Sequence, residues 1–377
     1  SEIRMVLIRG YSTRQVFFVK LMMIVLALFI FIVGYVACSY LVASVIFEHQ
    51  TVISSFLSFD DLTSVQVFLM TLKYYGLLFL ILAVFAMVIA FFAMFTKSVI
   101  STTVIGLLIL NIIPLIQTFI LSFQKTGDFG SSQWAGFENY KRLFSDPAVW
   151  QATGNTLKYV LMVIPFIIIF SLLVAVLLNQ KIKGKSIYRV IYFLPMVAAP
   201  AAVAMVWKWL FNSEFGLINY LLSLIGIQGP QWVSDPNFAL IAIAIVGIWS
   251  AVGYNMILLL AGLQEIPKDY YEAASIDGAG SIRQFFSVTL PLVSPSLYFV
   301  MVTSIISAFQ VFDVIFMMID KTSMAIESTQ SLVYLFYQHS FTVNDKGYGS
   351  AIIMLLLAII MVITFIQSKI EKKWVHY

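Results

Sequence analysis

A polar stretch at residues 264–291 interrupts an otherwise strongly apolar sequence and holds the side chains best suited to recognising another protein. Glu272 can offer its carboxylate to an Arg or Lys of a partner in a charge-assisted hydrogen bond. Ala273 and Ala274 follow, and their small side chains let a second backbone come close. The chemistry that this pattern predicts is docking rather than catalysis.

Local signals predict that this stretch folds as a helical elbow. A proline and an acidic residue open it, so we expect a helix over residues 268–277. Gly278 is placed to end that helix, because glycine adopts the left-handed conformation without a Cβ clash. A second short turn over residues 281–288 then leads to Leu290 and Pro291, where the next apolar run begins.

Residue patterns typical of enzymes are missing from the sequence. Gly184-Lys185-Ser186 looks like the end of a phosphate-binding loop, but Asn179 stands where that loop needs a glycine, so we expect no ATP site in this chain. The histidines are scattered, and the one cysteine, Cys38, lies in an apolar run, which indicates neither a metal site nor a disulfide. We therefore expect a protein that catalyses no reaction and holds no cofactor of its own.

The composition is that of a membrane protein. Hydrophobic residues make up 61% of the 377-residue chain and charged residues only 11%, whereas globular proteins average about 25% charged residues. A soluble protein of this length could not bury so much apolar surface. The formal net charge of +4 is small, so we expect contact with membrane lipid and no binding of nucleic acid.

Windows of about 20 apolar residues predict eight transmembrane helices. We place them at residues 21–47, 74–95, 99–121, 156–178, 190–211, 238–263, 292–318 and 350–366. Both termini then lie inside, and the Lys/Arg clusters at residues 4–20, 181–189 and 369–373 all fall on the cytoplasmic side. The expected fold class is an all-α polytopic membrane protein with its elbow in the cytoplasm.

Two parts are expected along the chain. Residues 1–95 join a basic segment to a two-helix hairpin that looks appended, whereas residues 96–377 hold the prolines, glycines and polar residues of a six-helix core. Residues 122–154 are expected to form an outer loop with short interfacial helices. Lys208, beside two tryptophans, is interpreted as an anchor at the headgroup level.

The elbow resembles the cytoplasmic loop of permease subunits in binding-protein-dependent ATP-binding-cassette (ABC) importers. The positions that carry the resemblance are Glu272, Ala273, Ala274, Asp277, Gly278, Ala279, Phe285, Leu290 and Pro291. Residues 188–195 and 304–312 look like the carbohydrate-uptake branch of that family, the maltose and glycerol-phosphate type, and the resemblance covers about residues 98–377. The first two spans resemble the extra hairpin of the maltose-type subunit, whose large extracytoplasmic insert is here only the loop at residues 122–154.

This resemblance implies a type I ABC importer permease fold in the bacterial cell membrane. It implies that the elbow inserts into a cleft on a cytoplasmic ATPase, so that ATP and magnesium are bound by the partner. The expected partners are a second permease subunit in a heterodimer, two ATPase subunits and an extracellular substrate-binding protein.

The resemblance also points to a substrate path through the sixth and seventh spans. Ser304, Ser307 and Val311 share one helical face by their spacing. With Ser250 and Tyr254, they are similar in position to residues that line the sugar site of the maltose-type subunit. Neighbouring candidates are Asn255, Phe309, Gln310 and Asp313, although Asp313 could instead bond a helix terminus. The family's asparagines are Ala308 and Val311 here, so maltose handled in the same way is not expected.

Several readings stay open at this point. The sugar is not named by the sequence, and glycerol-phosphate or another polyol is an alternative substrate. A different class, a stand-alone secondary carrier, would need charged or ion-coordinating residues at the midplane. An intramembrane enzyme would need an acid–base or metal constellation.

Overall fold

The computed structural model describes residues 108–126, 132–180 and 182–375, together with Met22, Val52–Ser54 and Asp61–Thr63. The chain divides into two compact units, Ser1–Ile116 and Gln117–Tyr377. In the first unit, strand β1 (Val52–Ser54) pairs antiparallel with β2 (Asp61–Thr63). The two predicted spans at residues 21–47 and 74–95 lie outside the described residues, Met22 excepted.

The described end of the third predicted span is a π-helix, η1 (Leu108–Ile112), followed by α5 (Ile113–Leu121). A short antiparallel hairpin of β3 (Gln124–Thr126) and β4 (Ser132–Trp134) comes next, and then α6 (Glu138–Ser145). The Asn139 amide of α6 donates to the carbonyls of Ser122 and Gln124 at 2.9 and 2.8 Å, which fastens the hairpin to the helix.

Three helices in the described part are long and apolar enough to cross a membrane: α7 (Pro147–Asn179), α11 (Ala239–Glu265) and α19 (Lys346–Trp374). They confirm helices at three of the predicted spans. The expected loop at residues 122–154 was too long, because α7 already begins at Pro147. A proline suits that position, and the Asp146 carboxylate accepts from the Ala148 amide at 2.9 Å as a cap. Lys158, which the span assignment overlooked, lies exposed on this helix.

The fifth predicted span is broken rather than continuous. It consists of α8 (Lys185–Val197) and α9 (Pro200–Leu210), which are bent by 99° relative to each other. Pro200 explains the break, because the residue before a proline is driven out of the helical region. That residue, Ala199, has φ −59° and ψ 128°, outside the helical region.

The seventh predicted span is also interrupted. It forms α15 (Ser294–Phe309) and α16 (Asp313–Met318), and the helix stops over residues 310–312. No proline causes this break. Instead, the freed carbonyl of Val311 accepts a hydrogen bond from the Ser331 hydroxyl at 2.6 Å, which replaces the missing helical bond.

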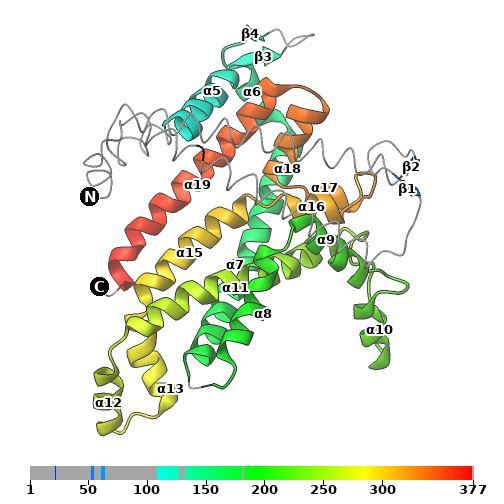
Figure 1. Ribbon diagram of the computed structural model, residues 1–377. Helices are drawn as coiled ribbons and strands as arrows, with labels where there is room; N and C mark the ends of the chain where they lie inside the picture. Colours follow the sequence, from blue (N-terminus) through cyan, green and yellow to red (C-terminus); the bar gives the residue numbers. More distant parts are fainter. Residues whose placement is uncertain are drawn as a thin grey trace. The chain divides into compact units, whose positions relative to one another are not determined.

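Short elements complete the described chain. On the outer side they are α10 (Leu217–Leu224), α17 (Ala325–Thr329), α18 (Leu332–Tyr337) and the π-helix η4 (Gln338–Thr342). The elbow at the other end contains α12 (Lys268–Ile276), α13 (Ser281–Gln284), the π-helix η3 (Phe285–Thr289) and α14 (Leu290–Leu292). Figure 1 shows this elbow projecting beyond the ends of α8 and α11.

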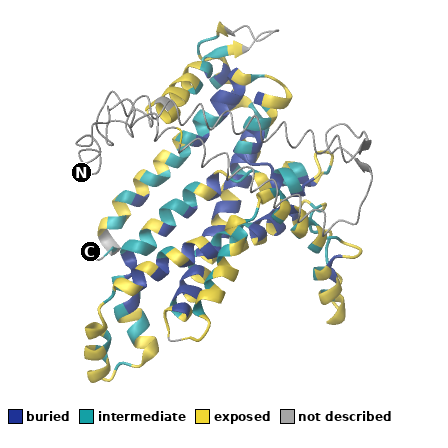
Figure 2. Ribbon diagram, viewed as in Figure 1, coloured by how far each residue is buried: buried dark blue, intermediate teal, exposed yellow. Residues whose placement is uncertain are grey.

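The core lies where α7, α11 and α15 pack against one another. Buried residues follow the inner faces of α7 and α11, whereas the elbow and α10 are largely exposed (Figure 2). One hydrophobic cluster joins α7 and α11 to the outer helices α16 to α18, and a second joins them to α15 near the elbow. The exposed faces of the long helices carry Leu, Ile and Phe, as expected of surfaces that meet lipid or another helix.

Candidate functional site

The elbow has the local structure that the sequence predicted. Helix α12 ends at Ile276, Gly278 adopts a left-handed φ of +75°, and the amide of Ala279 bonds the carbonyl of Ala274 at 2.9 Å. The chain therefore reverses at Gly278 and starts α13 three residues later.

Side-chain hydrogen bonds hold the two arms of the elbow together. The Gln284 amide donates to the Ser275 hydroxyl and to the Ala279 carbonyl, both at 2.9 Å. The hydroxyls of Tyr271 and Thr289 lie 3.1 Å apart, and Thr289 is only 7% exposed. The sequence search did not single out these residues, because no local rule predicts which polar side chains meet across a turn. They make the elbow a stiff element.

The structure separates the predicted coupling residues into two groups. Exposed positions are Glu272, Ala273, Asp277 and Gly278, with Ala274 half-buried beside them. The other group is half-buried: Ala279, Phe285, Leu290 and Pro291. Phe285 and Leu290 pack on the hydrophobic cluster shared by α7, α11 and α15. The first group can meet another molecule, whereas the second ties the elbow to the helices.

Large apolar side chains lie uncovered on the elbow. Ile276 is 87% exposed and Ile282 is 78% exposed, and Tyr270 and Phe286 are more than half exposed. Single exposed apolar residues are ordinary, but several on one short projecting element indicate a surface that another protein covers.

A cavity of about 580 Å³ lies among α7, α8, α9, α11, α15 and α16. Of the predicted path residues, the following line it: Ser250, Tyr254, Asn255, Ser304, Ser307, Gln310, Val311 and Asp313. The α15–α16 break contributes its own residues 310–312, and the α8–α9 bend contributes Pro195, Ala198 and Pro200. The two broken helices thus form walls of the same cavity.

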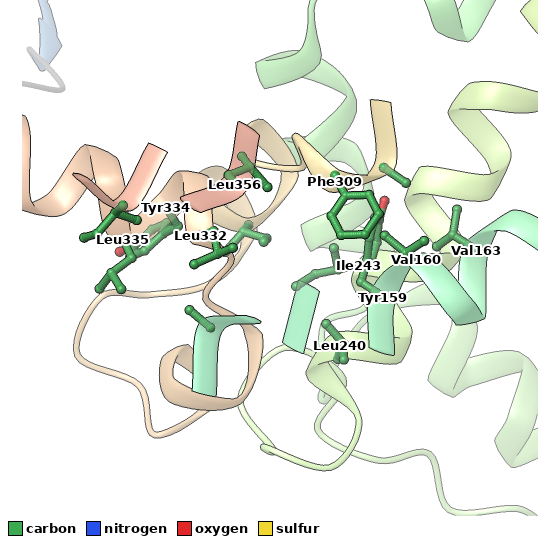
Figure 3. Close-up of a cluster of buried hydrophobic side chains, with 14 of the residues drawn as sticks. Tyr159, Val160, Val163, Leu240, Ile243, Phe309, Leu332, Tyr334, Leu335 and Leu356 are labelled. Carbon is green, nitrogen blue, oxygen red and sulfur yellow. The ribbon is translucent and has the colours of Figure 1, made fainter. Parts of the chain in front are cut away.

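Phe309 does not line this cavity. It is 1% exposed and belongs to the hydrophobic cluster with Tyr159, Val160 and Ile243 (Figure 3). Its neighbour Ala308 does reach the cavity, and one residue along a helix rotates a side chain by about 100°.

Two polar residues of the cavity were missed by the sequence search. Tyr159 lines it from α7, with its hydroxyl group against Gly247, and Thr303 lines it from α15. A tyrosine within the apolar fourth span was the available signal for Tyr159. Ser304 is 6% exposed, and its hydroxyl has no hydrogen-bond partner.

Two acidic residues flank helix α16: Asp313 begins it and Asp320 follows its end. Asp313 is the first residue of this helix, where an acid interacts favourably with the helix dipole, so the alternative role at a helix terminus also fits its position. Lys208 of α9 forms an ion pair with Asp320 at 3.1 Å. This exposed pair is compatible with the anchor at the headgroup level, which stays a prediction.

A bundle of apolar helices around a cavity with polar groups, with a stiff exposed elbow at one end, defines a membrane transport subunit. Residues 148–376 match the family described as "Binding-protein-dependent transport system inner membrane component", and the chain belongs to this family. As a permease it is a transport subunit and not an enzyme.

Two curated relatives are similar over most of their length. The probable ABC transporter permease protein YesP of Bacillus subtilis is 36% identical over 281 residues, which is 74% of this chain and 90% of YesP. The sn-glycerol-3-phosphate transport system permease protein UgpA of Pectobacterium atrosepticum is 33% identical over 267 residues, 70% of this chain and 89% of UgpA.

A solved structure confirms the fold of an ABC importer permease. It is the bacterial alginate ABC transporter in complex with an alginate pentasaccharide-bound periplasmic protein. The TM-score is 0.66 at 20% identity, and the match covers 74% of this chain and 95% of the other.

Proposed function

We propose that this chain forms half of the translocation pathway of an ATP-driven importer for a sugar or oligosaccharide, with glycerol-phosphate or another polyol as the alternative substrate. An extracellular binding protein delivers the substrate, and Glu272-Ala-Ala docks the chain onto a cytoplasmic ATPase that binds ATP and magnesium. The observation that carries this proposal is the rigid elbow, whose exposed arm holds Glu272 and Ala273. Membership of a binding-protein-dependent family argues against the stand-alone carrier.

The elbow is connected to the cavity through two helices. Helix α11 reaches from the cavity residues Ser250 and Tyr254 to its end at Glu265, just before α12. On the other side, α13 and α14 lead into α15, which carries Ser304 and Ser307. A displacement of the elbow would therefore move two walls of the cavity together. ATP binding would favour one arrangement of these walls by a shift of populations.

Partners follow from the surfaces that the chain leaves uncovered. Much of the surface of α8 and α9 is exposed and apolar, including Ile191, Leu194, Val197 and Met205. A second permease subunit that packs there would complete the path as a heterodimer, and each permease would dock one of two ATPase subunits. The solved relative in complex with a periplasmic protein supports the binding-protein partner.

The substitution Glu272→Lys tests the coupling role. The matched control is Glu138→Lys, which reverses another exposed charge, on the opposite side of the membrane. Glu138 lies 3.9 Å from Lys125 in a surface pair that contributes little to stability. We expect Glu272→Lys to lose co-purification of the ATPase, or to reduce uptake more than about tenfold, while the control keeps both. Unchanged uptake by Glu272→Lys with the ATPase still bound would overturn the proposal.

A further inference from the structure

Among the residues that the structure describes, the lining of the cavity contains a single carboxyl side chain and no basic one. That side chain is Asp313, and the other polar groups of the lining are hydroxyls and amides of Ser, Thr, Tyr, Asn and Gln. Within the same described part, no Lys, Arg or His side chain lines the cavity. A ligand in it therefore meets one negative charge and several neutral hydrogen-bonding groups.

The cations on the surrounding helices lie outside the lining of the cavity. Lys158 of α7 is exposed and does not belong to the lining, although its neighbour Tyr159 does. Lys208 of α9 is already paired with Asp320. Lys185 and Arg189 lie in the first turns of α8, whereas the lining residues of that element come from its other end, at Pro195 and Met196.

We propose that Asp313 makes this cavity selective against anions, so that its ligand is a neutral or cationic polyhydroxy compound rather than one bearing a phosphate, sulfonate or carboxylate group. This inference rests on the proposed function in one respect, that the transported substrate passes through this cavity.

Electrostatics gives the reason. An anion that leaves water needs a cation or several hydrogen-bond donors in return, and without them its transfer is costly. The start of α16, which could otherwise attract an anion, already carries the carboxylate of Asp313 in its first turn. Like charges within one cavity repel more strongly than in bulk water, because protein replaces part of the solvent.

The Ser304 hydroxyl is an independent sign that the cavity receives a hydrogen-bonding ligand. It is buried, lines the cavity and has no partner in the structure. A buried hydroxyl without a partner costs stability, and a sugar hydroxyl can both donate to it and accept from it. The uncharged groups of Ser307 and Gln310 lie in the same lining and suit the same chemistry.

The similar proteins give no single answer on ligand charge, because some are named for the neutral sugars trehalose, maltose and arabinooligosaccharides and others for anions. UgpA is named for sn-glycerol-3-phosphate, and the solved transporter was obtained with alginate, an acidic polysaccharide. Proteins with the same fold can differ in the charged side chains that line the cavity. We therefore infer the charge of the ligand from the lining of this chain and not from the names of its relatives.

Charged thiol reagents measure the potential inside the cavity without any transported substrate. The transporter would be assembled with its partner subunits in nanodiscs, with Cys38→Ser removing the one native thiol and Ser307→Cys placing a thiol on the lining. Modification rates would be compared for a cationic trimethylammonium-ethyl methanethiosulfonate and an anionic sulfonatoethyl methanethiosulfonate. Ser250→Cys provides a second position on α11 in case the first variant assembles poorly.

Each rate is divided by the rate of the same reagent with a small free thiol in solution, because a thiolate itself favours the cationic reagent. We expect the cationic reagent to have the higher relative rate, and Asp313→Asn to lower the ratio of the two relative rates at least about fivefold. The control Glu214→Gln removes an outer acid that does not line this cavity and should leave the ratio unchanged. Two results would overturn the proposal. One is equal relative rates for both reagents when Asp313 is intact, which a cation from the second permease would produce. The other is a ratio of rates that Asp313→Asn leaves unchanged. Neither reading depends on ATPase docking, so a failure here is distinct from a failure of the Glu272→Lys experiment.

Discussion

Replacing Gly278 with alanine should weaken coupling while leaving the permease folded. Gly278 has a φ of +75°, and a Cβ built on it meets no other atom within 4 Å. The cost of alanine is therefore purely conformational, about 1–2 kcal/mol for an L-residue in the left-handed region. Because the elbow is short and exposed, the substitution should lower the free energy of its local unfolding rather than that of the whole protein. The ratio of folded to locally unfolded elbow should then fall by about 5–30-fold.

The chain supplies a matched control two residues away. Gly280 has an ordinary extended backbone, with φ −67° and ψ 167°, and a Cβ there also meets nothing within 4 Å. Gly280→Ala should therefore change neither the elbow nor transport. Gly278→Asn should have a smaller effect than Gly278→Ala, because asparagine tolerates the left-handed conformation better.

The assay is uptake per ATP hydrolysed, in proteoliposomes that contain the assembled transporter and its binding protein, alongside the thermal midpoint of each purified variant. We expect Gly278→Ala to reduce uptake per ATP at least about fivefold with little change in the midpoint. If Gly278→Ala transports as well as Gly280→Ala, the left-handed turn is not required for coupling and the reasoning fails.

Two further outcomes are expected of the packing and of the outer surface. Gly253→Ala should destabilise the permease by about 1–3 kcal/mol, because the new Cβ would overlap the backbone carbonyl of Tyr192 on α8. Gly154→Ala in α7 has open space and should raise stability slightly, so thermal midpoints that rank the two variants the other way would contradict the packing. Burial, reinforced by Arg142, lowers the pKa of His339 below its ordinary value near 6.5, although Asp146 and Asp345 partly oppose the shift. The unfolded chain then binds more protons than the folded one below about pH 6.5, so stability should fall as pH drops from 7 to 5. We expect His339→Gln to make the thermal midpoint less dependent on pH. If the midpoint of the variant depends on pH as steeply as before, other groups cause the dependence.

Features set by neighbouring residues were predictable from the sequence. The ends of α12 and the reversal at Gly278 follow from proline, acidic and glycine preferences that act over a few residues, and the structure confirms them. The apolar runs likewise located α7, α11 and α19, because length and hydropathy are sufficient for a span.

Features set by packing were not predictable in the same way. The span at residues 190–211 was predicted as continuous although it contains Pro200, and its bend of 99° depends on what α9 packs against. The break before Asp313 has no proline, and its free Val311 carbonyl is bonded by Ser331, twenty residues further along than Val311. Phe309 was a candidate because it neighbours the predicted path residues in the sequence, yet a rotation of one helical position places it in the core. Tyr159 was missed because it reaches the cavity from a helix on which no path was expected.

The link between elbow and cavity is a packed core. From Asn255 in the cavity to Glu265 before the elbow, α11 rises by about 15 Å as one uninterrupted helix. Its intervening residues Met256, Leu259 and Leu263 are buried in one cluster with α7, with Val293 just before α15 and with Val300 within α15. Because such a core is close-packed, it shifts as a unit rather than being compressed. The contact of Gly253 with the Tyr192 carbonyl joins α8 to the same unit. A force on Glu272 would therefore reach three walls of the cavity through packing alone, without a hydrogen-bonded relay.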